Sequence, residues 1–267
     1  MKLSRSIVMC ALMAAGMFAM SNARVIAQEL VQNGGFELNG GAGISSLTNW
    51  NIVNYGTGTK WYAQTGNNSP ISNTFGVPPP GGSFAAMSDQ LNGVPGTTIL
   101  YQDFAVPLNV SSAAVSFDRW IDNDYFPSDG PAFFNPGTLD YSVQDNNQQA
   151  RFDIVTTSAD LLSLAGGDVL FNLYFTQGFD QTTQGYDTYV NDMTGFLQSH
   201  AGETLRIRLA EVNNVCDNQG CYGLRFGADN VSFTYEQQAA VPEPSMLILM
   251  TGGIGVGAVW IRRRRRG

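Results

Sequence analysis

Acidic and aromatic side chains alternate in one short stretch of the sequence. Asp118, Trp120 and Asp122 fall on one side of a predicted strand, because successive side chains of a strand point to opposite faces. Asp124 follows in the next loop. An aromatic ring can stack on the apolar face of a sugar, and carboxylates accept hydrogen bonds from its hydroxyl groups. The stretch predicts a glycan-binding patch, although a strand end that runs into a solvated acidic loop would have the same pattern.

Two further aromatic residues, Trp61 and Tyr62, form a second candidate for sugar contact. Motifs for catalysis are scarce. The chain has a single histidine, His200, and no Gly-x-Ser-x-Gly motif, phosphate-binding loop or zinc-ligand spacing. A pair of carboxylates could hydrolyse glycosides, but among so many acidic residues some pair will be close by chance. We therefore expect that the protein is not an enzyme.

Strands must position these side chains. Short segments rich in β-branched and aromatic residues recur between turn-rich loops, and along one of them Leu205, Ile207 and Leu209 alternate with two arginines. This pattern predicts an all-β fold, an antiparallel sandwich with one solvated face per sheet. The predicted strands are Trp50–Tyr55, Thr59–Gln64, Ser83–Met87, Thr97–Val106, Ala113–Ile121, Thr138–Gln144, Ala150–Thr156, Val169–Phe175, Thr204–Glu211 and Gly223–Tyr235. Only Tyr189–His200 has a helical pattern, which predicts one short helix.

Three motifs, in the order in which they occur, indicate a particular type of β-sandwich. The domain opens with VQNGGFE (31–37), has LYQDF (100–104) in its middle and closes with ADNVSF (228–233). This order resembles the jelly-roll carbohydrate-binding modules and the wider galactose-binding-like family. In those modules the first-strand glutamate and the last-strand aspartate often meet around a structural calcium. The resemblance implies that Glu37 and Asp229 bind Ca²⁺; a hydrogen-bonded carboxyl pair without metal is the alternative.

The composition of this domain, residues 28–240, limits its partners. It carries 21 acidic and six basic side chains, a formal charge of −15, against −8 for the whole chain. This charge argues against a nucleic-acid partner and suits solubility or divalent cations. Its two cysteines, Cys216 and Cys221, are expected to form a disulfide in an oxidising compartment, because a zinc site would need further ligands.

The last segment, residues 241–267, has three parts. Pro242, Glu243 and Pro244 precede an uncharged run, Ser245 to Ile261. Five arginines follow: Arg262, Arg263, Arg264, Arg265 and Arg266. As a helix the run would be about 25 Å long, which predicts a transmembrane helix with a cytoplasmic arginine cluster; a terminal core helix is the alternative. The order of the parts resembles the PEP-CTERM sorting signal, which in that family is read by a membrane-embedded exosortase.

The amino end predicts export. Lys2 and Arg5 precede the apolar stretch Ile7–Met20, and small residues follow, so residues 1–27 are expected to be a signal peptide. We expect an exported protein that passes through an inner-membrane intermediate to the cell surface or extracellular matrix. The leading expectation for its role is a structural or adhesive protein associated with exopolysaccharide. A carbohydrate-binding module with a specific glycan ligand is the alternative, and a glycoside-acting enzyme is the third possibility.

Overall fold

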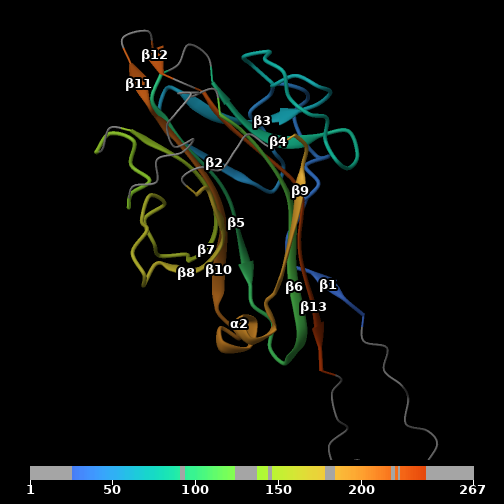
Figure 1. Ribbon diagram of the computed structural model, residues 1–267. Helices are drawn as coiled ribbons and strands as arrows, with labels where there is room; N and C mark the ends of the chain where they lie inside the picture. The colour runs from blue at the N-terminus through green and yellow to red at the C-terminus, as the bar shows by residue number, and fades with distance from the viewer. Residues whose placement is uncertain are drawn as a thin grey trace, which may run out of the picture. The chain divides into compact units, whose positions relative to one another are not determined.

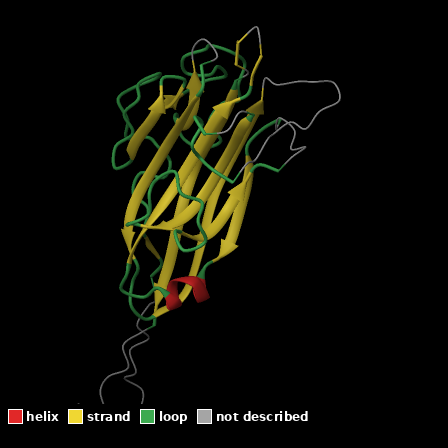
Figure 2. Ribbon diagram, turned by 90° about the vertical axis from the view of Figure 1, so that its left-hand side faces the viewer, coloured by secondary structure: helices red, strands yellow, loops and turns green. Residues whose placement is uncertain are grey.

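Two antiparallel sheets face each other and form a β-sandwich (Figures 1 and 2). The computed structural model describes residues 26–90, 94–123, 137–143, 146–177, 184–217, 220–221 and 223–238. The strands are β1 (Gln28–Glu29), β2 (Asn51–Gly56), β3 (Thr59–Gln64), β4 (Ala85–Gln90), β5 (Gly96–Ala105), β6 (Val110–Asn123), β7 (Asn147–Thr156), β8 (Val169–Phe175), β9 (Asp187–Asp192), β10 (Thr204–Asn214), β11 (Cys216–Asp217), β12 (Gly220–Cys221) and β13 (Leu224–Gln237). The helix α2 (Thr194–Ser199) lies at the end of the sandwich opposite the β11–β12 hairpin.

The first sheet, called here the six-stranded sheet, has the order β3-β4-β13-β6-β9, and β1 pairs with β13 beside them. The second, the five-stranded sheet, has the order β2-β5-β10-β7-β8. The predicted all-β sandwich with one short helix is confirmed. Within the described residues no helix is long and apolar enough to cross a bilayer. The predicted transmembrane helix and the sorting signal lie outside these residues.

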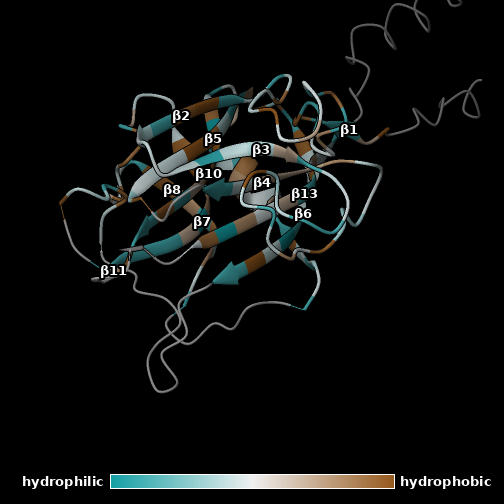
Figure 3. Ribbon diagram, turned by 90° about the horizontal axis from the view of Figure 1, so that it is seen from above, coloured by the Kyte–Doolittle hydropathy of each residue, from teal (hydrophilic) through white to brown (hydrophobic). Residues whose placement is uncertain are grey.

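The core lies between the two sheets and follows from the alternation in the sequence. Leu205, Ile207 and Leu209 of β10 are buried, as predicted. Phe117 of β6 packs against Phe152 of β7 across the sandwich, with 4.3 Å between ring centroids. Viewed along the sandwich, the strands are banded by hydropathy (Figure 3). Each fully buried large apolar side chain contributes about 1.5–3 kcal/mol, so this inner layer is the main source of stability.

Two secondary-structure predictions are wrong. The segment predicted as a strand at Thr138–Gln144 forms turns in its described part, residues 137–143. Its apolar residue Leu139 is buried, and the Leu139 carbonyl accepts a hydrogen bond of 2.6 Å from the Thr97 hydroxyl. The predicted helix Tyr189–His200 begins as strand β9 and is helical only from Thr194. Local hydrophobic pattern could not detect β9, because its conformation depends on pairing with β6, far away in the sequence.

Candidate functional site

Carboxylates gather on the outer face of the six-stranded sheet. Asp229 of β13 lies directly opposite Asp118 of β6 in the strand register. Directly opposite like charges destabilise a sheet unless donors or protons compensate for them. Glu37, from the opening loop, adds a third carboxyl group, whose charge acts on Asp229. The sequence prediction that Glu37 and Asp229 come close together is thus supported, and Asp118 joins them.

Hydrogen-bond donors surround each of these carboxylates. Asp229 accepts the backbone N–H of Asn230 at 2.7 Å and that of Gly81 at 3.3 Å. Glu37 accepts the N–H groups of residues 83 and 84, both through Oε1, at 2.8 and 2.9 Å. Asp118 accepts the Thr188 hydroxyl and the Asn230 side-chain amide. Each carboxylate is therefore already stabilised by the protein's own donors.

The local backbone is shaped for this arrangement. The pairing of β13 with β6 shifts register between Asp229 and Ser232, and Asn230 has a positive φ of 49°. Gly82, with φ of 58°, approaches the Glu37 carboxylate so closely that a Cβ there would lie 2.1 Å from Oε1. Glycine at 82 is thus needed both for the left-handed conformation and for the contact. The ADNVSF motif noted in the sequence forms this irregular part of the strand.

Burial shifts the acid–base properties of the cluster. Desolvation raises the pKa of Asp229 to about 7, with smaller contributions from Asp118 and Glu37, and the two backbone hydrogen bonds oppose it. The hydroxyl of Tyr186 is also buried, has no hydrogen-bond partner, and has its pKa raised by burial and by the neighbouring aspartates. Asp229 can therefore carry a proton near neutral pH, which reduces the repulsion within the cluster.

The two predicted calcium ligands, Glu37 and Asp229, both belong to this carboxylate cluster. Across the described part of the chain, no group of three or more His, Cys, Asp or Glu side chains is placed to hold a metal ion. The backbone donors occupy carboxylate oxygens that a cation would use. The geometry resembles the alternative considered for the sequence, a hydrogen-bonded carboxyl cluster, and Ca²⁺ at Glu37 and Asp229 stays a prediction.

A chelator tests the calcium prediction. If Ca²⁺ bridges Glu37 and Asp229, the midpoint of thermal unfolding should fall when EDTA is added and recover with excess CaCl₂, because a ligand of the folded state stabilises it. The Glu37→Gln variant should then lose this response. An unchanged midpoint in the unmodified protein would rule out structural calcium.

The tryptophans proposed for sugar stacking do not offer their rings to a ligand, which corrects both predictions. Trp61 has 0% of its surface exposed and packs against Phe226 in the core between the sheets. Trp120 is 2% exposed on the outer face, where its Cβ and the Tyr186 hydroxyl fill the space over Gly227. A strand pattern shows which residues share a face, but it does not show whether other segments cover that face.

The remaining predicted site residues have separate environments. Tyr62 is partly exposed on the outer face of β3. Asp122 forms an ion pair with Arg225, its register partner on β13, instead of facing a ligand alone. Asp124 lies outside the described residues. The β11–β12 register places Cys216 opposite Cys221, and the disulfide between them stays a prediction.

A different group, which was not predicted from the sequence, lies on the outer face of the five-stranded sheet. We call it the tyrosine face: Tyr55 of β2, Tyr101 and Asp103 of β5, and Arg206 of β10. Arg206 donates to both carboxylate oxygens of Asp103, at 2.6 and 3.0 Å. Its guanidinium also lies 4.2 Å from the centre of the Tyr101 ring. Both tyrosines are partly exposed, so aromatic surface and a paired charge are presented side by side.

Alternation along β10 predicted that Arg206 faces outward, but its neighbours depend on the register with β5. Arg206 lies opposite Asp103, about a hundred positions away in the chain. The bidentate pair fixes the guanidinium, and this hydrogen bonding raises the Arg206 pKa. Tyr55 lies close enough to Tyr101 and Asp160 for their charges to raise its pKa further, after burial. No spacing in the sequence indicates this set.

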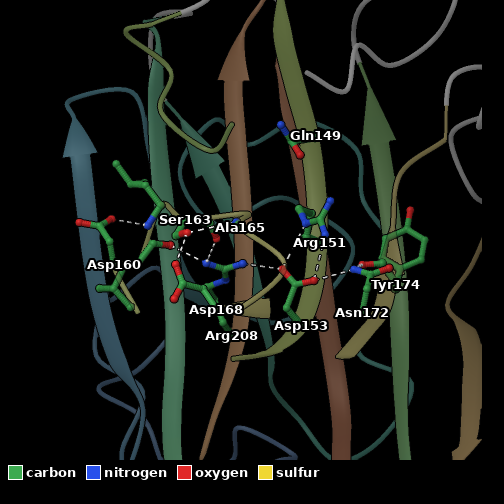
Figure 4. A network of polar contacts seen from close by, with 12 residues as sticks. Gln149, Arg151, Asp153, Asp160, Ser163, Ala165, Asp168, Asn172, Tyr174 and Arg208 are labelled. Carbon is green, nitrogen blue, oxygen red and sulfur yellow. Dashed lines mark hydrogen bonds and ion pairs between the residues drawn. The ribbon is translucent and has the colours of Figure 1, made fainter. Parts of the chain in front are cut away.

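Next to the tyrosine face, a loop crosses the same sheet and is held there by hydrogen bonds from a buried arginine (Figure 4). We call residues 157–168 the covering loop. Arg208 donates at 2.9 Å to the carbonyls of Leu161 and Ser163 in this loop, and at 2.8 Å to Asp153. Asp153 also accepts hydrogen bonds from Arg151 and Asn172. The covering loop therefore closes the β10 and β7 part of the face. Its leucines pack together with Tyr55 and Tyr101 against one apolar cluster, and both tyrosines stay partly exposed beside it.

No protein-family model matches the chain, and no curated protein matches it. Solved structures that resemble it include TmCBM61 in complex with β-1,4-galactotriose, at 10% identity and a TM-score of 0.41, covering 77% of this chain and 97% of that one. The K2 cleaved adhesin domain of Lys-gingipain has 12% identity and a TM-score of 0.38, covering 79% and 99%. A carbohydrate-binding module specific for non-crystalline cellulose, CBM28, has 15% identity and a TM-score of 0.35, covering 77% and 94%. Several structural neighbours are thus carbohydrate-binding β-sandwiches, but likenesses at these values do not identify the ligand or the site of this chain.

Proposed function

We propose that the domain of residues 28–240 is an extracellular glycan-binding module, with the tyrosine face as its binding surface. The observation that carries this proposal is the pairing of two partly exposed tyrosine rings with the bidentate Arg206–Asp103 pair on the outer face of the five-stranded sheet. Tyrosine rings offer apolar surface to the C–H side of a sugar. Guanidinium donors and carboxylate acceptors match its hydroxyl groups.

The shape of this surface suits a polysaccharide chain better than a single buried sugar. Tyr55 and Tyr101 are four residues apart in register terms, because Tyr55 lies opposite Thr97 on β5. At about 3.3 Å per residue, their backbone positions are about 13 Å apart along the strands. Two or more sugar units could therefore contact the face at once. Weak contacts repeated along a polymer would give the module useful affinity through avidity.

Replacing Tyr101 with alanine tests the surface. We expect the affinity for the bound polysaccharide, found first on a glycan array, to fall about tenfold or more, as for loss of a central aromatic contact worth about 1.4 kcal/mol or more. Affinity electrophoresis in gels containing that polysaccharide would measure the change.

Tyr62→Ala is the matched control, because Tyr62 is a partly exposed tyrosine on the other sheet. It should leave binding unchanged. If Tyr62→Ala reduces binding and Tyr101→Ala does not, the β3 patch predicted from the sequence is the ligand surface and the tyrosine face is not. Binding by neither array nor gel would contradict the proposal as a whole.

Export and sorting complete the proposed function. We infer that residues 1–27 direct secretion and that residues 241–267 are an exosortase-type sorting signal with a membrane-spanning intermediate. The support is the order of Pro242-Glu243-Pro244, uncharged run and arginine cluster. This route would deliver an acidic glycan-binding domain to the cell surface or matrix.

Alanine at Pro242, Glu243 and Pro244 together should trap the full-length product in the membrane fraction, because the processing enzyme would no longer recognise it. Fractionation with mass spectrometry of the carboxyl terminus would measure this. Ser245→Ala should be processed normally. Full-length protein in the cytosol with its leader intact would contradict export altogether.

A structural or adhesive role in an exopolysaccharide matrix is the second candidate. It is favoured by the −15 charge of the domain, which suits a hydrated polymer matrix better than tight packing against one ligand. Such a protein would stay in the matrix when the tyrosine face is altered, whereas a glycan-binding module would be released. Turnover of a glycan, abolished by Asp118→Asn or Asp229→Asn, would instead indicate the glycoside-acting enzyme.

A further inference from the structure

The interior of the sandwich changes from apolar to polar towards the end that carries the β11–β12 hairpin. Along β10 the inward-facing residues are Leu205, Ile207 and Leu209, and then Glu211 and Asn213. All five are buried, Glu211 and Asn213 at 0% exposure. A polar pair in this position interrupts the hydrophobic core.

Polar groups from two other strands face this pair. Thr59 and Trp61 point inward from β3, and the Thr59 hydroxyl is close enough to Glu211 to lower its pKa. Gln148 of β7 lies opposite Asn213 in the register and donates to its side-chain carbonyl at 3.1 Å. We call these five residues the interior polar site: Thr59, Trp61, Gln148, Glu211 and Asn213.

Several atoms of the interior polar site are buried without a hydrogen-bond partner. They are Thr59 Oγ1, Trp61 Nε1, Gln148 Oε1, Asn213 Nδ2 and both carboxyl oxygens of Glu211. The Thr59 hydroxyl lowers the Glu211 pKa as a hydrogen-bond donor would, but the two groups do not reach normal hydrogen-bond geometry. Buried polar atoms are nearly always satisfied in folded proteins, and each unsatisfied one is costly. So many together indicate that something else bonds to them.

The charge state of Glu211 limits which class of ligand the interior polar site can bind. Complete burial raises its pKa well above the usual value, and the nearby Asp89 carboxylate raises it further, while Thr59 opposes. Among the described residues, no lysine, arginine or histidine forms an ion pair with it. Burial therefore favours the neutral carboxyl group, which offers one O–H donor and one carbonyl acceptor.

The balance of donors and acceptors then indicates the class of ligand. Trp61 and Asn213 offer only donors at their free atoms, Gln148 offers only an acceptor, and Thr59 and Glu211 offer both. A bare cation would leave the indole and amide N–H groups unsatisfied, and an anion would leave the Gln148 carbonyl unsatisfied. A hydroxyl group donates and accepts at the same time, so it meets both needs.

We propose that the interior polar site binds hydroxyl groups between the two sheets, supplied either by internal water molecules or by a small sugar or polyol. Either ligand bridges β3 to β10 and β7 and joins the sheets where the apolar core ends. The site lies on the opposite side of the five-stranded sheet from the tyrosine face. It does not depend on the proposed function, and Tyr101→Ala leaves it intact.

The indole N–H of Trp61 is the direct probe. The full chain is labelled with ¹⁵N-tryptophan, and the Trp61 signal is assigned by its loss in Trp61→Phe. Internal water should give a cross-peak from the Trp61 indole proton to water, with no change on adding sugar. A sugar ligand should shift this signal saturably during titration with glucose, galactose or glycerol, and the shift should disappear in Glu211→Leu. Neither a water cross-peak nor a shift would overturn the proposal.

Two variants of Glu211 provide an independent measurement that does not use the NMR signal of Trp61. Glu211→Gln keeps hydrogen-bonding atoms in place, whereas Glu211→Leu fills the same volume without them. If hydroxyl groups bond there, the leucine variant should unfold at a lower temperature than the glutamine variant. If the site is dry, the leucine variant should unfold at a higher temperature, because removing an unsatisfied buried carboxyl is favourable, and the proposal fails.

Discussion

Replacing Asp153 with alanine is expected to lower the free energy of unfolding by about 3–5 kcal/mol, the cost of leaving a buried charge without its partner. Asp153 and Arg208 are both 0% exposed, and their ion pair measures 2.8 Å. Burial already lowers the Arg208 pKa, and Asp153 is the main group that counteracts this. Without the carboxylate, the guanidinium would keep only its bonds to the covering-loop carbonyls. Urea unfolding followed by far-UV circular dichroism would measure the loss.

Asp103→Ala is a closely matched control. Asp103 and Arg206 also form a cross-strand pair that includes β10, on the same face of the same sheet, but the Asp103 side chain is 40% exposed. Water can replace the lost partner there, so we expect a loss of no more than about 1 kcal/mol. Equal losses for the two variants would show that burial does not decide the strength of the Asp153 interaction.

A double variant separates the unpaired charge from the lost packing. Asp153→Leu combined with Arg208→Met removes both charges and keeps apolar volume at both positions. We expect it to be more stable than Asp153→Ala, because no buried charge is left alone. The carbonyls of Leu161 and Ser163 would still lose their donor, so the recovery should be incomplete. Faster proteolysis within the covering loop would locate the remaining loss.

The sequence predicted much of the fold because period-two alternation reports directly on burial. Strands β3 and β8 have the predicted bounds, and the leucines and isoleucine of β10 are buried, as their alternation predicted. The failures have a common cause. The turn-forming segment around Leu139 is apolar because it covers the outer face of a sheet, and β9 is a strand because β6 is its neighbour. Both depend on contacts that no local window contains.

The candidate sites were predictable only in part, for the same reason. The resemblance carried by the order of the motifs predicted that Glu37 and Asp229 lie close together. Asp118 was not part of that prediction, because its place beside Asp229 depends on the pairing of β6 with β13. Trp61 is aromatic and lies on a strand, which fits a core residue as well as a sugar platform, and the structure places it in the core. The tyrosine face and the interior polar site each combine residues from three strands, so single-segment spacing could not indicate either.

The carboxylate cluster should make the folded protein less stable as the pH rises. The Asp229→Asn variant should lack this pH dependence. The pKa of Asp229 is raised from 3.8 to about 7 in the folded state. A raised pKa means that the proton binds the folded state more tightly, so this stabilisation is complete below pH 3.8 and is lost as the pH rises through about 7. The difference corresponds to about 4 kcal/mol for an enclosed carboxyl, and we expect about 2–3 kcal/mol because solvent near the surface loop screens part of it.

The measurement is the difference in unfolding free energy between the unmodified protein and Asp229→Asn, at pH 4.5 and pH 8 in the presence of EDTA. Asparagine cannot ionise, so the variant should gain on the unmodified protein as the pH rises. Asp192→Asn should show no such gain between pH 4.5 and pH 8, because hydrogen bonds from Thr194 lower the Asp192 pKa from 3.8 and this carboxyl is ionised throughout that range. If Asp229→Asn shows no gain at pH 8, the carboxylate is stabilised in its ionised form. A cation between Glu37 and Asp229 would produce that result only in the absence of EDTA, so the chelated sample separates a metal site from a proton-sharing cluster.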